Sequence, residues 1–390
     1  MDFQNLRILL TDGDGRQTLT ILHDLKELGC FVAVICSNKW NMCYVSNLPD
    51  RKLLYQAIGN ALPRDEDYAE YILNLLKTGE YDVLFPVGEK MTNIVTAHEE
   101  LFGKYVKLAC APRDAYIKVF NKQTTFEIAI QNRIPCPNTR RNEQSIDEYL
   151  RDAVFTIISK PRQGLGSVGF RKFETELEFR NALTNNLLDP DEYVIQEFIH
   201  FNKRIDAFLF IDKNGEVKTS MAIEVLRWYP LDAGTSTFTR TVDNPDVIKY
   251  GSEILRALHF QGLADVSFMI EKQSGQLKLM EINGRIPAGI KLSWYCGYNV
   301  ARQLVEMAYG CEAVSYPENK KFGMNARHSQ ADLMWFIKSK DRFKARPSWF
   351  DNRNTTDLVY WKGDIKPYIF YSLRGLFKYK RFMKKREHCL

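Results

Sequence analysis

The sequence predicts an α/β N-terminal lobe followed by α+β lobes with antiparallel sheets. Three observations carry this prediction: a strand–helix–strand pattern at the start, a change to strands joined by tight turns after Pro112, and a length of 390 residues. A chain of this length exceeds one ordinary hydrophobic core, so we expect two or three lobes that share a cleft. Clefts between lobes are common sites of ligand binding.

The first lobe is predicted to contain a parallel sheet. Residues 6–11 form a short apolar run, and the amphipathic leucine pattern that follows stops at Gly29. Further strands are expected over 31–36 and 81–86, with a helix over 67–77 before the latter. Loops after parallel strands line the functional edge of such a sheet. These loops supply the candidate substrate-binding residues of this lobe: Asp12, Asp14 and Glu89.

The pattern changes after Pro112. We expect one helix bearing Lys118 and Lys122, and then strands. Turns at 212–215 and 272–275 indicate hairpins. The strands are predicted over 154–159, 170–173, 193–196 and 205–211. After about residue 315 the pattern weakens into an aromatic and basic tail.

Composition excludes several classes of protein. With 45% apolar and 26% charged residues, the chain is typical of a globular protein. No apolar run approaches the ~18 residues that a membrane span needs. The start lacks the pattern of a signal peptide, so we expect a cytoplasmic protein. Eight cysteines without C-x-x-C pairs predict reduced thiols, and six histidines without a His/Cys cluster disfavour a zinc site.

Residues Gly164-Leu-Gly-Ser-Val-Gly169 match the G-x-G-x-x-G pattern of a dinucleotide turn, but residues 170–173 continue as a strand instead of opening a helix. A glycine-rich hairpin that covers phosphates explains the same residues, because bare backbone approaches oxygens closely. On the loop alone, a plain surface hairpin explains them equally well. Lys160, at the end of the preceding strand, favours the phosphate interpretation because it adds a cation.

Glu281 and Asn283 are two residues apart, so on a strand their side chains face the same way. Asp265 and Ser267 share that spacing on the strand before, and the turn at 272–275 would bring both strands together. Four oxygen-bearing side chains would then converge, as magnesium with phosphate oxygens requires. The alternative, a solvated sheet face, is disfavoured by the apolar neighbours.

These motifs, in this order, resemble the ATP-grasp superfamily, and in particular the carboxylate-amine ligases similar to the carbamoyl-phosphate synthase large subunit. The resemblance covers about residues 6–315. It implies an ATP- and Mg²⁺-dependent ligase that forms a carbon–nitrogen bond between a small-molecule carboxylate and an amine. The route implied is an acyl-phosphate intermediate, with release of ADP and phosphate.

The resemblance also implies roles for individual residues. The ATP contacts are expected at Lys122, Lys160, Gly164, Gly166, Ser167, Gly169, Gln196, Glu197, Phe198, Ile199 and Asp206. The metal ligands are expected at Glu281 and Asn283, with Asp265 as a third ligand that substitutes for the side chain usual at position 267. Arg285, in the segment Met280-Glu-Ile-Asn-Gly-Arg285, and Arg240 are the catalytic candidates. The domains expected are a Rossmann-like pre-ATP-grasp domain over 1–110, an ATP-grasp domain over 111–315 and a C-terminal extension over 316–390. Within the second, 111–200 includes the glycine-rich subdomain and 201–315 is the metal-binding subdomain.

Three positions depart from the family pattern. Ser267 stands where a metal-binding carboxylate or glutamine is usual, Gly284 replaces a proline, and the acid expected to hold the ribose is unclear around residues 202–206. The alternative function is therefore an ATP-binding regulatory module without turnover.

The C-terminal tail is strongly basic. From Lys366 onward it has eight basic residues and one acid, Glu387. A helix docked on the body is the favoured interpretation, followed by a helix at the inner face of the membrane, with nucleic acid last. We therefore expect no nucleic-acid partner. A homodimer is compatible with the sequence, which does not determine the oligomeric state.

Overall fold

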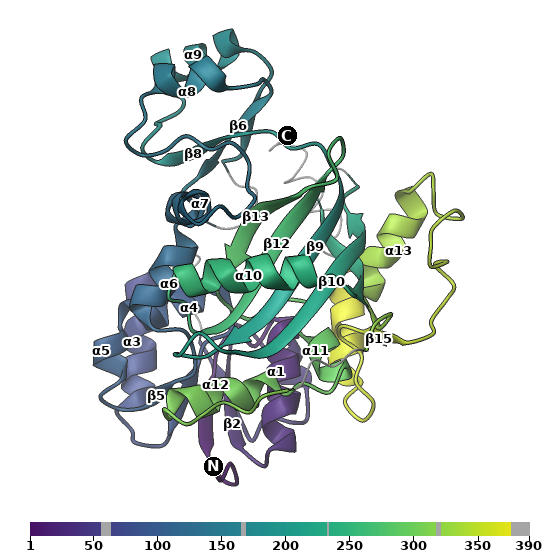
Figure 1. Ribbon diagram of the computed structural model, residues 1–390. Coiled ribbons are helices and arrows are strands. Elements are labelled where there is room, and N and C mark those ends of the chain that lie inside the picture. Colours follow the sequence, from purple (N-terminus) through teal and green to yellow (C-terminus); the bar gives the residue numbers. More distant parts are fainter. Residues whose placement is uncertain (56–63, 165–168, 232–233, 317–320, 376–390) are drawn as a thin grey trace.

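The computed structural model describes residues 1–55, 64–164, 169–231, 234–316 and 321–375. These residues form three sheets, of five, seven and three strands. In Figure 1 the five-stranded sheet lies behind the lower part of the molecule, the seven-stranded sheet crosses the centre, and the three-stranded sheet stands at the top.

The N-terminal lobe is a parallel α/β layer, as predicted. Its strand order is β3-β2-β1-β4-β5, and all four pairings are parallel. The strands are β1 (Arg7–Leu10), β2 (Phe31–Cys36), β3 (Arg51–Leu54), β4 (Val83–Phe85) and β5 (Lys107–Leu108). The helices are α1 (Arg16–Glu27), α2 (Met42–Val45), α3 (Asp65–Leu76), α4 (Glu89–Ala97) and α5 (Glu99–Phe102). The central strands are apolar and buried, which is typical of a parallel sheet covered on both faces.

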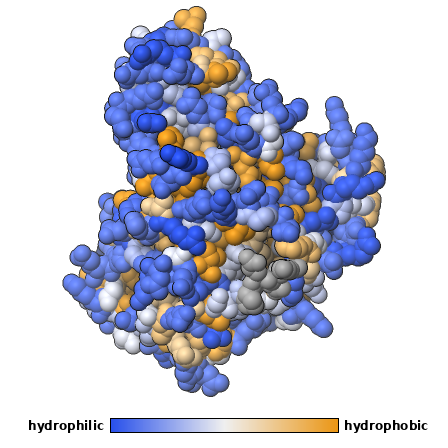
Figure 2. Space-filling view, viewed as in Figure 1, coloured by the Kyte–Doolittle hydropathy of each residue, from blue (hydrophilic) through white to orange (hydrophobic). Residues whose placement is uncertain are grey.

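The small lobe is an antiparallel sheet, β7-β6-β8, with two helices. Its elements are α8 (Ile146–Asp152), β6 (Ile157–Pro161), β7 (Arg171–Phe173), α9 (Glu176–Thr184) and β8 (Tyr193–Glu197). Tyr149, Ile157, Phe179 and Ile195 form its core. The glycine segment joins β6 to the antiparallel β7, so the prediction of a hairpin rather than a dinucleotide turn is confirmed. The surface of this lobe is mainly hydrophilic (Figure 2).

The central sheet has the order β13-β12-β9-β10-β11-β14-β15, and its pairings are antiparallel except for β14 with β15. Its strands are β9 (Phe201–Ile211), β10 (Val217–Tyr229), β11 (Thr235–Val242), β12 (Gly262–Glu271), β13 (Leu277–Asn283), β14 (Asn325–Arg327) and β15 (Thr355–Asp357). The hairpins predicted at 212–215 and 272–275 are both present. The last two strands lie beyond residue 315, where the sequence pattern was weak.

The two faces of the central sheet pack against different partners. Ala207, Leu209 and Val266 belong to a core with α10 (Pro245–Ala257) on one face. Phe208 and Phe210, the alternating residues of β9, join the core of the N-terminal lobe on the other face. Polar side chains on this second face therefore look toward the N-terminal lobe.

Lys118 and Lys122 lie on two helices, so the prediction of one helix is wrong. The helices are α6 (Arg113–Phe120) and α7 (Lys122–Gln131). Asn121 between them has an extended backbone, and its side chain accepts hydrogen bonds from the N–H groups of Gln123 and Thr124. Asparagine is among the best residues for starting a helix in this way.

The segments after β13 pack on two partners. α11 (Lys291–Tyr295) and α12 (Val300–Ala308) pack against α1 of the N-terminal lobe, whereas α13 (Ser329–Lys338) packs against β10 and β11 of the central sheet. A helical segment over 366–375 ends the described part of the chain. The Trp361 ring stacks on His23 with 3.6 Å between centroids, and Ser46 donates a hydrogen bond of 2.6 Å to Asp364. Among the described residues, no helix is both long and apolar enough to cross a membrane. The basic residues after 375 lie outside the described part of the chain.

Candidate functional site

The predicted metal-binding residues lie on a β-hairpin, which brings their two strands together as expected. Asp265 on β12 is paired with Asn283 on β13, and Ser267 is paired with Glu281. On its other side, Ser267 is paired with Asp206 of β9. Directly paired residues point to the same face, so these side chains share one surface of the central sheet. It is the face toward the N-terminal lobe.

Arg204, two residues before Asp206 on β9, lies over the same face. Its Nε and Nη2 atoms donate to the two carboxylate oxygens of Asp206, at 2.9 and 3.2 Å. Nη2 also donates to Ser267 Oγ at 3.0 Å. Burial alone would lower the pKa of Arg204, but Asp206 and Glu281 outweigh it and raise the pKa. The guanidinium therefore remains a fixed cation among carboxylates.

Two lysines reach this surface from other elements. The Lys160 ammonium, at the end of β6, donates to the carbonyl of Met280 at 3.2 Å and lies 4.5 Å from the centroid of the Phe126 ring. The Lys122 ammonium donates to the carbonyl of Gly164 at 3.1 Å, and the Lys122 N–H donates to the carbonyl of Arg162 at 2.8 Å. The start of α7 is thus tied to the start of the glycine loop.

Electrostatic coupling indicates that these groups form one cluster. Burial lowers the pKa of Lys160 to about 8, with Glu281 opposing the shift and Lys122 adding to it. Burial alone would raise the pKa of Glu281, yet Arg204, Lys160 and Lys122 hold it below its usual value. Burial and then the nearby Asp206 raise the pKa of Asp265 to about 7. The cluster is buried and densely charged, which is typical of functional sites.

The N-terminal lobe contributes Glu89, the first residue of α4. Its Oε2 atom lies 3.5 Å from Arg285 Nε. Burial raises the pKa of Glu89, and the cations Arg285 and Lys122 oppose the shift. Arg285 Nη2 also donates to Asn283 Oδ1 at 3.1 Å. Glu89 of the N-terminal lobe therefore meets Arg285, which also contacts Asn283, and all three are predicted site residues.

Asp12 and Asp14 have other partners. Asp12 is buried, and its Oδ2 accepts hydrogen bonds from Gly88 N at 2.8 Å and Val87 N at 3.3 Å. It thereby fixes the turn that presents Glu89. Asp14 forms an ion pair with Arg374 of the C-terminal helical segment. The structure brings Glu89 to the cluster and gives Asp12 a positioning role.

The ATP-binding candidates of residues 196–199, predicted to hold adenine, comprise the last two residues of β8 and the two that follow it. The Gln196 side chain is buried and donates to Thr139 Oγ1 at 2.7 Å. The N–H groups of Glu197 and Phe198 donate to the carbonyls of Asn138 and Thr156. These bonds, together with the buried side chain of Ile199, hold the segment in place beside the small lobe. The structure thus gives this segment structural contacts, and its predicted contact with adenine remains a prediction.

The glycine hairpin is described only at its ends. Gly164 and Gly169 both have positive φ, 126° and 78°, which favours glycine. A Cβ atom at Gly169 would lie 2.8 Å from Pro161 Cγ. The candidates Gly166 and Ser167 lie outside the described residues.

Arg240 does not join the cluster. It is paired with Glu224, which is paired in turn with Ile205 of the core beneath α10. Arg240 therefore lies on the opposite face of the sheet from Asp206, and its Nε donates to Asn325 Oδ1 at 2.9 Å. The geometry does not support the predicted catalytic role.

The donor set fits magnesium that arrives with a nucleotide. No group of three or more His, Cys, Asp or Glu side chains in the described part of the chain is arranged to hold a metal ion alone. Glu281 and Asn283 nonetheless offer hard oxygen atoms on one face, and Mg²⁺ is commonly bound by one or two carboxylates together with substrate phosphates.

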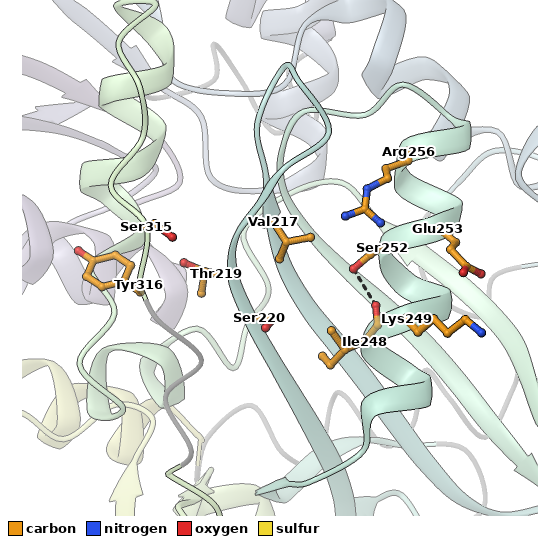
Figure 3. A pocket seen from close by; sticks show the side chains of 10 residues that line it. All are labelled: Val217, Thr219, Ser220, Ile248, Lys249, Ser252, Glu253, Arg256, Ser315 and Tyr316. Atoms are coloured by element: carbon orange, nitrogen blue, oxygen red, sulfur yellow. Dashed lines mark hydrogen bonds between the residues drawn. The ribbon is translucent and has the colours of Figure 1, made fainter.

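Sequence reasoning missed Arg204 and Phe126 as members of the site. The signal for Arg204 was its two-residue spacing from Asp206 on a strand. A cavity of about 340 Å³ lies elsewhere, between β10, α10 and residues 315–316, with Thr219, Ser252 and Arg256 in its lining (Figure 3). None of the predicted site residues lines it.

Comparison with known proteins bears on the fold of the chain. The family model described as ATP-grasp in the biosynthetic pathway with Ter operon matches residues 216–331. Rhizobium etli pyruvate carboxylase superposes with a TM-score of 0.67 at 14% identity, over 83% of this chain and 30% of that chain. The biotin carboxylase–βγ-ATP complex from Campylobacter jejuni gives 0.67 at 15% identity, over 82% and 74%.

The chain has an ATP-grasp fold. N5-carboxyaminoimidazole ribonucleotide synthetase from Thermotoga maritima shares it, with a TM-score of 0.57 at 16% identity over 83% of this chain and 79% of that chain. No curated protein matches significantly in sequence. The matched ATP-grasp segment, 216–331, contains Asp265, Glu281, Asn283 and Arg285 but neither of the two lysines.

Proposed function

We propose that this chain is an ATP-dependent carboxylate-amine ligase, which activates a carboxylate as an acyl phosphate and releases ADP and phosphate. The observation that carries the proposal is the charged cluster between lobes, where Lys160 and Lys122 face Glu281 beside the glycine hairpin. An ATP-grasp fold agrees with ATP-dependent ligase chemistry. The carbamoyl-phosphate-synthase-like branch remains part of this proposal.

In this proposal, Lys122 and Lys160 bind the phosphates, and Glu281 and Asn283 would hold Mg²⁺. Bound Mg²⁺ would neutralise charge on the transferring phosphoryl group. The chain's own residues position the reactants, since phosphoryl transfer needs orientation and electrostatic stabilisation more than covalent help. Lys160 is well placed for this because its buried ammonium is fixed by Met280 and Phe126.

Arg285 and Glu89 are the proposed contacts for the reacting carboxylate and amine. Arg285 offers a planar set of donors that suits a carboxylate or an acyl phosphate. Glu89, on the N-terminal lobe, offers an acceptor for an amine. Their separation of 3.5 Å brings both to the same point between the N-terminal lobe and the central sheet.

A regulatory module that binds ATP without turnover is the second candidate. One observation favours it: Ser267, at a metal-binding position in the resemblance, contacts Arg204. Peripheral contact of the basic C-terminal tail with an anionic membrane is a separate proposal, motivated by charge alone.

A two-stage experiment separates these functions. Small carboxylates and amines are first screened by thermal shift with Mg²⁺ and a non-hydrolysable ATP analogue, because a bound ligand raises apparent stability. Each pair that binds is then incubated with ATP, and the nucleotides are separated by chromatography. Ligase activity predicts ADP and phosphate in equal amounts. AMP as the main product would contradict the acyl-phosphate route, and binding without any release would favour the regulatory module.

A further inference from the structure

Arg204 occupies an unusual place in the cluster. Its guanidinium bridges Asp206 and Ser267 through three hydrogen bonds of 2.9 to 3.2 Å. These bonds come from Nε and Nη2, and none of them uses Nη1. Ser267 is fully buried, so its hydroxyl meets the arginine inside the protein. The arginine is held as a rigid fork on the face that looks toward the N-terminal lobe.

The position of Arg204 bears on where a metal ion can bind. Ser267 is paired with Glu281, and both share a face with Asp265 and Asn283. On the side of this face nearer β9, the hydroxyl of Ser267 and the carboxylate of Asp206 already accept hydrogen bonds from the permanent cation of Arg204. A divalent ion there would meet the guanidinium charge at short range. On the other side, on β13, the oxygen atoms of Glu281 and Asn283 remain available to a metal ion.

The charges of the cluster also disfavour a divalent ion beside Arg204. The cluster joins four carboxylates, on Glu89, Asp206, Asp265 and Glu281, with four basic side chains, on Lys122, Lys160, Arg204 and Arg285. An arginine is always charged and is weakly hydrated, which suits a buried cation that faces phosphate. If Arg204 were removed, the carboxylates of Asp206 and Asp265 would repel each other without this neighbouring cation.

We infer that Arg204 is a built-in cation of the phosphate site, which replaces a divalent ion at the Ser267 end and leaves room for one Mg²⁺ at Glu281 and Asn283. The inference rests on the proposed function, because it assumes a bound nucleotide. The simplest alternative is an ion pair that only stabilises the sheet. The two differ in how many divalent ions accompany the nucleotide.

The test counts bound ions in the full-length protein without any turnover. The protein is saturated with a non-hydrolysable ATP analogue, and bound Mn²⁺ is measured by electron paramagnetic resonance. Wild type and Arg204→Lys, which keeps the charge, should each bind one Mn²⁺ per nucleotide. Ser267→Glu alone should also bind one, because Arg204 would neutralise the new carboxylate. Arg204→Gln combined with Ser267→Glu should bind two.

Two Mn²⁺ in wild type, or one in the double variant, would overturn the inference. If the double variant does not fold, the affinity of Arg204→Gln for the analogue decides. Loss of a charge-assisted contact predicts a decrease of roughly tenfold or more, with a smaller change in Arg204→Lys. Equal affinities of Arg204→Gln and wild type would overturn the inference. Failure of wild type to bind the analogue at all would contradict the proposed function itself.

Discussion

Glu89 and Arg285 approach to 3.5 Å across the boundary between the N-terminal lobe and the central sheet. Glu89 is the first residue of α4, and the buried Asp12 holds the turn before it. Arg285 follows β13 and also donates to Asn283. The contact therefore links a predicted substrate residue to the predicted metal-binding hairpin. It brings the N-terminal lobe and the central sheet together at the candidate site.

Replacement of Glu89 by Gln should affect turnover more than nucleotide binding. Gln keeps the size of the side chain and removes the charge that faces Arg285. We expect the Kd for MgATP to change less than about threefold, and the rate of ADP release with an identified substrate pair to fall by roughly 10²-fold. Both are measurable by calorimetry and a coupled ADP assay. A variant with normal turnover would remove Glu89 from the site.

Asp265 and Ser267 should differ in their effect on magnesium. Asp265 stands opposite Asn283, whereas the Ser267 hydroxyl contacts Arg204. Loss of a carboxylate lowers the negative charge available to a hard cation, so Asp265→Asn should raise the Mg²⁺ concentration for half-maximal activity by about tenfold. Ser267→Ala should raise it less. A greater effect of Ser267→Ala in the magnesium titration would exclude compensation by Asp265.

Lys291 should make stability depend on pH. Its ammonium contacts the carbonyl of Tyr360 and lies 4.0 Å from the centroid of the Trp361 ring, and burial lowers its pKa to about 7. An unfolded lysine titrates near pH 10.4, so between about pH 7 and 10 the unfolded state binds more protons. Stability from this group therefore rises with pH in that window, and the penalty is complete below about pH 7.

The matching experiment compares wild type with Lys291→Met by thermal unfolding at about pH 6.5 and 9.5. Methionine cannot titrate. The melting temperature of wild type, measured relative to that of the variant, should therefore be higher at pH 9.5 than at pH 6.5 by on the order of 2–5 °C. A difference that is the same at both pH values would show that Lys291 titrates normally.

Trp361 should anchor the C-terminal region to the N-terminal lobe. Only 4% of it is exposed, and it stacks on His23 and packs edge-on against Trp294. Trp361→Ala should destabilise the protein by about 3–5 kcal/mol through the cavity it leaves. Trp40, which is 65% exposed, is the control, and Trp40→Ala should cost less than about 1 kcal/mol. Chemical denaturation of both variants measures the difference, and equal losses would contradict the anchoring role.

The sequence predicted those parts of the fold that depend on local patterns. Parallel strands in the first lobe and the hairpin between β12 and β13 follow from apolar runs and turn residues, so Asp265 and Asn283 could be paired in advance. The division between α6 and α7 was missed because both flanks have helical character, and only the cap at Asn121 ends the pattern. Strands β14 and β15 are three residues each, too short for periodicity to detect.

Side-chain partners were harder to predict than positions. Arg240 and Asp14 were predicted as site residues, but their side-chain partners, Asn325 and Arg374, come from distant segments of the chain. Arg204 lies in the stretch 202–206 where the expected ribose-binding acid was unclear, and its contact with Ser267 depends on the register of β9 against β12. Gly284, which replaces a proline, has a structural reason: a Cβ atom there would lie 2.6 Å from Val119 Cγ2.

The most direct test of the nucleotide site is calorimetric titration of MgATP into wild type, Lys160→Met and Lys344→Met. Lys160 is buried beside Glu281, whereas the Lys344 ammonium pairs with Asp341 on the exposed surface. Wild type and Lys344→Met should bind one nucleotide with similar affinity. Lys160→Met should bind at least about tenfold more weakly, because a buried charge contact with phosphate is lost. No binding by wild type, or equal affinity in all three proteins, would contradict the assignment of this charged cluster as the ATP site.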